Sequence, residues 1–152
     1  MEKFKEDFKE ALKHLRIADH MTYVTFPLLN EKRLLLKIFD EIHNSIASCI
    51  NSILNYEYYY KRIDLYSTSR DNLDTFFSVA KNYNISNEHI KKIKEIFEIN
   101  RKHKQSAMEF VKKEKFVIMS DSLNVRILDL RTIKEYLLAA KEVLVGVGKK
   151  IG

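Results

Sequence analysis

The chain has 152 residues, of which 45% are apolar and 32% charged, with only three glycines and one proline. This length and balance suit a single globular domain, residues 1–152. No apolar run approaches the roughly 20 residues that span a bilayer. We therefore expect neither a membrane-spanning helix nor a membrane partner. Because turns need glycine and proline, their scarcity favours long helices with few loops.

The single cysteine and the uneven distribution of charge indicate where the protein is located and which partners it can attract. Cys49 has no partner in the chain, which excludes an intrachain disulfide and makes the cytoplasm the expected location. Residues 1–75 carry 11 Lys and Arg against 12 Asp and Glu, whereas residues 76–152 carry 16 against 9. The basic C-terminal half either attracts acidic partners, nucleic acid included, or simply keeps a lysine-rich chain in solution.

Two long helices are predicted first. Apolar residues recur every three or four positions from Glu2 to Tyr23, and Pro27 is expected to end this helix. Asn30 is a candidate cap for the next helix, which is predicted to run from Glu31 to Tyr58. Its apolar arc is wide, so we expect a central helix that contacts several neighbours.

Two further helices follow, each after a serine that can cap it. Ser69 precedes a short apolar stripe, and Ser86 precedes a longer helix predicted to reach about Lys113. A last helix is predicted after Asp129, which is also a suitable cap.

The stretch before the last helix differs from the rest. Residues 116–119 and 125–128 are rich in β-formers and are separated by Ser, Asp and Asn. We predict a small β-hairpin at about residues 115–128; the alternative is a helix that continues through it. The predicted fold is therefore all-α: an antiparallel bundle of four or five helices with a small β-hairpin before the last helix.

The best functional clue is polar residues on an apolar helix face. In "EINRKHKQSAMEF", residues 98–110, Asn100, His103 and Lys104 fall on the arc that the apolar residues define. His43 lies within the apolar arc of the long second helix. Because a buried polar group without a partner costs about 1–3 kcal/mol, these side chains need each other, water or a ligand.

Two interpretations stay open for this cluster. In one, each histidine is an ordinary core or boundary residue, and Lys104 extends its ammonium into water. In the other, His103 and His43 exchange protons near neutral pH as catalytic candidates, Arg101 and Lys104 hold a phosphate, and Asp19 orients one imidazole.

Other motifs add little chemistry. No Glu-x-x-His pair, zinc pattern or glycine-rich phosphate loop is present, so no metal and no cofactor is expected. "VKKEK", with Lys112 and Lys113, and the Lys149–Lys150 end are candidate anion sites. "NYEYYYKR", residues 55–62, either closes one end of the bundle or stacks on unpaired bases.

The order of a long helical pair, a short helix and a penultimate helix bearing "NRKHK" resembles the HEPN group of prokaryotic helical bundles. This resemblance implies a compact bundle and an RNase, toxin or nucleotide-associated module. The catalytic motif of that group is an arginine, four to six residues and a histidine. Arg16 and His20 have three residues between them, and Arg101 and His103 have one, so RNase catalysis does not carry over.

Two functions are therefore predicted. The first is a non-enzymatic module that binds another protein or forms a homodimer. It rests on the strongly amphipathic character of the predicted helices and on the absence of a complete set of catalytic residues. The alternative is an HEPN-type RNA- or nucleotide-binding module, or an RNase, that uses Arg101, His103 and Lys104 within the basic half.

Overall fold

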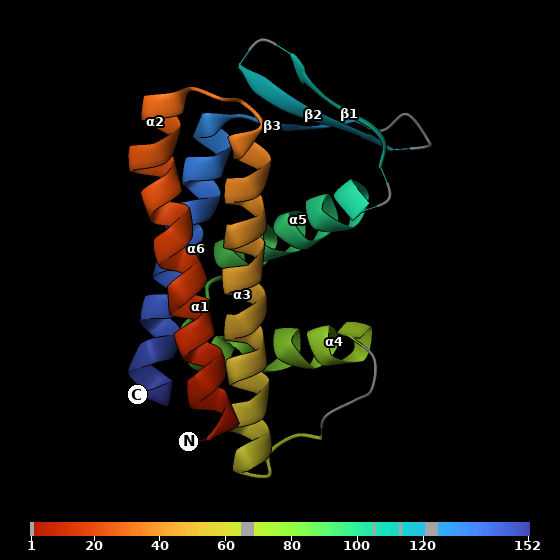
Figure 1. Cartoon of the computed structure of the whole chain (residues 1–152). Coiled ribbons are helices and arrows are strands. Elements are labelled where there is room, and N and C mark those ends of the chain that lie inside the picture. The colour runs from red at the N-terminus through yellow and green to blue at the C-terminus, as the bar shows by residue number, and fades with distance from the viewer. Residues whose placement is uncertain (1, 65–68, 105, 113, 121–124) are drawn as a thin grey trace.

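In the computed structural model, residues 2–64, 69–104, 106–112, 114–120 and 125–152 are described. Three long helices form the body of the protein: α1 (Lys3–His20), α3 (Leu34–Tyr59) and α6 (Leu130–Ile151). α1 runs antiparallel to α3 and α6, so that both termini lie at the same end (Figure 1). None of the helices in these ranges is long and apolar enough to cross a membrane.

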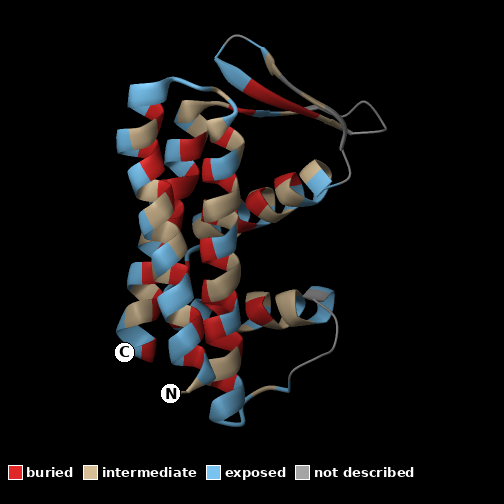
Figure 2. Ribbon diagram, viewed as in Figure 1, coloured by how far each residue is buried: buried red, intermediate tan, exposed pale blue. Residues whose placement is uncertain are grey.

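The faces that α1, α3 and α6 turn toward one another are apolar and bury one continuous core (Figure 2). α3 contributes its whole central stretch, as its wide apolar arc predicts, and Phe39 in its second turn is fully buried. Cys49 is buried in the same core, and burial raises the pKa of its thiol to about 12. Each such apolar side chain contributes about 1.5–3 kcal/mol when it leaves water.

Two shorter helices, α4 (Ser69–Val79) and α5 (Asn87–Lys104), lie across α3 rather than along it (Figure 1). A 3₁₀ turn, η2 (Ala80–Tyr83), follows α4, and Phe76 fixes this segment through a fully buried ring. The predicted cap of α5 is confirmed, because Ser86 Oγ accepts the backbone N–H of His89 at 3.1 Å.

A small antiparallel sheet precedes α6, in the order β1 (Ser106–Lys112), β2 (Lys115–Ser120), β3 (Val125–Leu128). The predicted hairpin is confirmed: β2 and β3 pair, with Phe116 opposite Leu128 and Met119 opposite Val125. Asp129 then caps α6 as predicted, with Oδ1 accepting the N–H of Thr132 at 2.8 Å.

Two predictions for the residues around Pro27 are wrong: the end of the first helix at Pro27, and Asn30 as the cap of the next helix. Helix continues through Pro27 as a π-helical turn, η1 (Met21–Thr25), and α2 (Phe26–Leu29). The wider turn lets Phe26 N–H donate to Met21 O and accommodates the proline, which has no N–H. Asn30 does not cap the following helix; it ends this one in a left-handed conformation with φ of 49°, which asparagine tolerates.

The predicted fourth helix is too long. α5 ends at Lys104, and the residues from Ser106 onward pair with β2 instead. A run such as "SAMEFVK" fits a helical stripe and a strand about equally well, and pairing with β2 decides between them.

Candidate functional site

A pocket of about 590 Å³ lies where α4 and α5 meet α3. This volume falls within the range of small-molecule sites. We call it the α3–α4–α5 pocket. Its lining comprises His43, Ala47, Ile50, Asn51, Leu54, Arg70, Asn72, Leu73, Phe97, Asn100, Arg101 and Lys104.

Helical spacing explains which side chains reach the pocket. On α3, residues 43, 47, 50, 51 and 54 are three or four positions apart and therefore share one face. On α5, residues 97, 100, 101 and 104 do the same. The apolar members Ile50, Leu54 and Leu73 are continuous with the core, whereas the polar and charged members come from the helix sides that turn toward solvent.

The pocket carries positive charge that its own lining does not neutralise. Arg70 comes from α4, and Arg101 and Lys104 from α5. None of the described lining residues is acidic, and within the described residues none of these three cations forms an ion pair. Part of the reason for cations in the last turn of α5 is that helix's own dipole, whose negative end lies there. Arg70 lies in the first turn of α4, where the helix dipole is positive. The dipole therefore does not explain a cation at this position.

His43 lies in the wall of this pocket as a neutral ring. It packs edge-on against Phe97 with the ring centroids 4.8 Å apart, and its Nδ1 lies 3.4 Å from Oδ1 of Asn44. Burial lowers the pKa of His43, the contact with Asn44 opposes that shift, and the nearby charge of Lys104 lowers the pKa further. An uncharged imidazole beside a phenyl ring can contact a flat ligand and can accept or donate a hydrogen bond.

His103 does not line the pocket, although His43, Asn100, Arg101 and Lys104 do. Its Nδ1 lies 2.5 Å from Oε2 of Glu109 in β1. The pKa of Asp40 reflects this neighbourhood: burial raises it, the His103 ring lowers it and the Glu109 carboxylate raises it. His103 thus connects the end of α5 to the sheet. His43 and His103 do not line the same pocket, so the structure gives no support to the predicted proton exchange between them.

The remaining predicted site residues lie elsewhere. Lys112 is at the end of β1, opposite Lys115, and does not line the pocket. Lys113 lies outside the described residues. Asp19, the predicted partner of an imidazole, forms an ion pair with Lys141 instead.

Residues 55–62 close one end of the bundle. Tyr56 contacts the rings of Phe4, Tyr60 and Tyr83 at centroid separations of 5.1, 5.0 and 6.4 Å. Arg62 lies over Tyr56 and Tyr60. These ring contacts give Tyr56 a structural role at this end of the bundle, whereas Tyr58, Tyr59 and Tyr60 are about half exposed.

Glu57 is the polar centre of this end. Although it is only 3% exposed, it accepts a hydrogen bond of 2.8 Å from the hydroxyl of Tyr83 and pairs with Arg62. Burial and the Glu57 carboxylate raise the pKa of Tyr83. We call Glu57, Arg62 and Tyr83 the base cluster; its members satisfy one another.

The pocket is suited to bind an anion with a flat body. Three cations can contact a phosphate or carboxylate, Phe97 and His43 offer ring surface, and the amides of Asn51 and Asn100 can donate and accept hydrogen bonds. Among the described residues, no group of three or more His, Cys, Asp or Glu side chains is placed to hold a metal ion.

Sequence reasoning missed Arg70 and Asn51 as lining residues. No local signal marks them, because their position depends on where α4 docks on α3. The chain matches no known protein family, no curated protein and no solved structure.

Proposed function

We propose that this protein is a binding module for nucleotides, either free or as units of single-stranded RNA, and that the α3–α4–α5 pocket is its site. The observation that supports this most strongly is an aromatic wall combined with three cations in a described lining that contains no acidic residue. Cations bind the phosphate, and the partly buried rings and the amides of the lining bind a base. A fatty acid would leave the amides without partners.

The orientation of α4 adds to the proposal. α4 begins at Ser69, so its N-terminal turn, with Arg70 and Leu73, borders the pocket. The N-terminal end of a helix carries partial positive charge that favours a bound phosphate. The phosphate is therefore expected near Arg70 and Arg101, and the base near Phe97.

Catalysis is not part of the proposal. His43 is the one titratable side chain in the pocket that could act near neutral pH, and no described carboxylate in the lining would orient it. The HEPN-like resemblance stays a prediction, for which cleavage of a labelled RNA by this protein is the direct assay.

The test is a titration with adenosine monophosphate and with a short oligoribonucleotide, each at low and at high salt. Arg101→Ala should weaken binding of both by about tenfold, because a hydrogen bond to a charged group contributes about 1.5–3 kcal/mol. Lys91→Ala is the matched control: Lys91 is an exposed cation on the same helix that does not line the pocket.

Asn100→Ala separates base from phosphate recognition. We expect it to weaken binding of adenosine monophosphate while leaving binding of inorganic phosphate unchanged. Binding of the oligoribonucleotide alone would identify RNA as the ligand source. No binding of either nucleotide at low salt, or equal losses from Arg101→Ala and Lys91→Ala, would refute the proposal.

A further inference from the structure

A second cavity lies at the end of α3, at the end of the bundle where both chain termini lie (Figure 1). It has a volume of about 620 Å³, and its lining includes Asn55, Tyr58, Tyr59, Lys61, Ile63 and Asp64. We call it the tyrosine cavity. Tyr58 is 48% and Tyr59 57% exposed, so both rings present surface to solvent. Exposed rings are stacking surfaces for unpaired bases, because every base has a flat face.

Contacts within the protein hold the lining of the tyrosine cavity in place. Tyr59 packs edge-on against Phe4 and Tyr60, with centroid separations of 5.5 and 5.1 Å. Asn55 donates from Nδ2 to Oδ2 of Asp7 at 2.7 Å, so its Oδ1 is left to accept a hydrogen bond. A fixed ring surface beside a fixed amide acceptor suits the face and the amino edge of a nucleobase.

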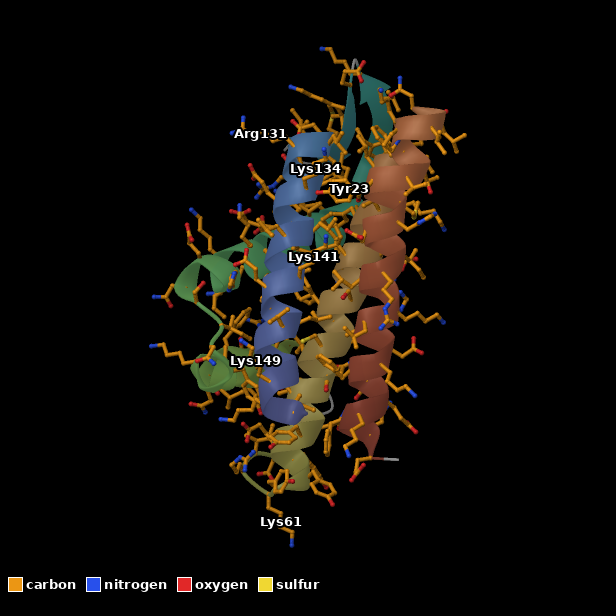
Figure 3. The ribbon with its side chains drawn as sticks, turned by 90° about the vertical axis from the view of Figure 1, so that its left-hand side faces the viewer. Tyr23, Lys61, Arg131, Lys134, Lys141 and Lys149 are labelled. Atoms are coloured by element: carbon orange, nitrogen blue, oxygen red, sulfur yellow. The ribbon has the colours of Figure 1, made fainter. Side chains whose placement is uncertain are left out.

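Lys61 borders this cavity in a conformation that lysine rarely adopts. Its φ is 58°, and its N–H donates to the carbonyl of Tyr58 at 2.9 Å while that of Arg62 donates to Glu57 at 2.9 Å. Glycine is the usual residue at this position of a helix end, because a side chain there costs backbone energy. A strained residue points to a function for its side chain. Lys61 forms no ion pair within the described residues, and it points away from the bundle (Figure 3).

The lining favours a nucleic acid over a protein partner. Among the described lining residues the only aliphatic side chain is that of Ile63, which is half-buried. Lysine and aspartate, which are depleted at the core of protein interfaces, lie among the rings as Lys61 and Asp64. Lys3 is paired with Asp7 at 3.1 Å, so the lining has no strong net charge. Binding in this cavity therefore depends on stacking, and the phosphates of a strand need cations elsewhere.

α3 connects the tyrosine cavity to the α3–α4–α5 pocket, which has those cations. Leu54 lines the pocket and Asn55 the cavity, and Asn51 of the pocket comes seven residues before Tyr58 of the cavity. Seven residues make nearly two turns, so Asn51 and Tyr58 lie on one side of α3, about 10 Å apart along its axis. Stacked nucleotides repeat about every 3.4 Å, so a strand of about six is long enough to occupy both sites.

We infer that the ligand is a single strand of nucleic acid rather than a free nucleotide. One nucleotide lies in the α3–α4–α5 pocket, a base further along the strand stacks on Tyr58 and Tyr59, and Lys61 contacts a phosphate beside that base. This inference rests on the proposed function of the pocket. Stacking alone binds weakly, so a mononucleotide does not fill the tyrosine cavity at concentrations that fill the pocket.

Dependence on strand length is the first test. At low salt, the adenosine hexanucleotide should bind about tenfold more tightly than the dinucleotide or adenosine monophosphate, because only the longer strand reaches the tyrosine cavity. RNA and DNA share the chemistry that both sites recognise. The deoxy form of the hexanucleotide distinguishes them, since the tighter of the two identifies the sugar of the natural strand.

Tyr58→Ala tests the stacking surface. It should weaken binding of the hexanucleotide by about tenfold and leave binding of adenosine monophosphate unchanged. Tyr58→Phe keeps the ring and should bind the hexanucleotide as the original protein does. Tyr23→Ala is the matched control, because Tyr23 is 52% exposed and lies far from Lys61 (Figure 3).

Lys61→Gly separates a structural role from a binding role. Glycine suits the left-handed position, so this variant should raise the melting temperature and yet weaken binding of the hexanucleotide by about threefold. Asn30→Gly changes another left-handed residue, at the opposite end of the bundle, and should leave binding unchanged (Figure 1). A more stable Lys61→Gly variant that binds the hexanucleotide as before would count against the inference.

The failure of this inference and the failure of the proposed function give different results. If adenosine monophosphate binds and Arg101→Ala weakens it, but the hexanucleotide binds no more tightly or is insensitive to Tyr58→Ala, only this inference is overturned. Self-association that Tyr58→Ala abolishes, with unchanged hexanucleotide affinity, would assign the tyrosines to a protein contact instead. If adenosine monophosphate does not bind, or binds equally well to Arg101→Ala, the proposed function fails and this inference fails with it.

Discussion

The base cluster and the α3–α4–α5 pocket both contain arginine, but the arginine is paired with a carboxylate in the first and not in the second. In the base cluster, buried Glu57 pairs with Arg62 and accepts the hydroxyl of Tyr83. In the pocket, Arg70 and Arg101 have no carboxylate in the described lining. Polar groups that satisfy each other stabilise the fold, whereas cations left facing a cavity are available to a ligand. The two regions should therefore respond differently to substitution.

The largest effect is expected from Glu57→Leu. Removing the carboxylate leaves the Tyr83 hydroxyl buried without its acceptor and frees Arg62, so unfolding in urea should show a loss of about 3 kcal/mol. Glu98→Leu is the control, because that exposed carboxylate pairs with Lys102 and Arg126 at 3.5 Å each among the described residues, and its loss should cost no more than about 0.5 kcal/mol. Equal losses would show that the base cluster does not stabilise the fold.

A smaller effect is expected from pH at His43. Burial lowers the pKa of this ring below its ordinary value of 6.5 in the folded protein. The unfolded chain therefore takes up the proton first as pH falls, so this contribution to stability is complete above pH 6.5 and is lost progressively below it. His43→Phe should reduce the loss of stability between pH 7 and pH 5. An unchanged pH profile would show that His43 is not buried.

The smallest effect on stability is expected from Lys104→Ala. The exposed ammonium forms no ion pair within the described residues, so unfolding free energy should change by no more than about 0.5 kcal/mol. Because the charge of Lys104 lowers the pKa of His43, the same variant should raise that pKa in a nuclear magnetic resonance titration. A drop in stability comparable to that of Glu57→Leu would erase the contrast between the two regions.

The sequence predicted the fold where local signals agree with one another. α6 combines a clean apolar face with an aspartate cap, and both features are observed. β1 was missed because its residues suit a helix as well as a strand, and only pairing with β2, the strand that follows it, decides. The prediction that Pro27 ends the first helix was wrong because a π-helical turn accommodates the proline. The helix-breaking rule for proline does not take such a turn into account.

The site was predicted only in part for a similar reason. His43, Asn100 and Lys104 could be found from helix angles, since each helix fixes the direction of its own side chains. Arg70 joins them through the docking of α4, and His103 leaves them because Glu109 enters from β1. Both outcomes depend on contacts between elements, which periodicity in one sequence does not record.

The most direct measurement is a nuclear magnetic resonance titration of isotope-labelled protein with adenosine monophosphate at low salt. If the pocket binds nucleotides, the backbone amide signals of Asn51, Leu73, Asn100 and Arg101 should shift together and saturate, while those of Glu57 and Arg62 stay in place. Saturable shifts confined to the base cluster, or no shifts at all, would contradict the proposal.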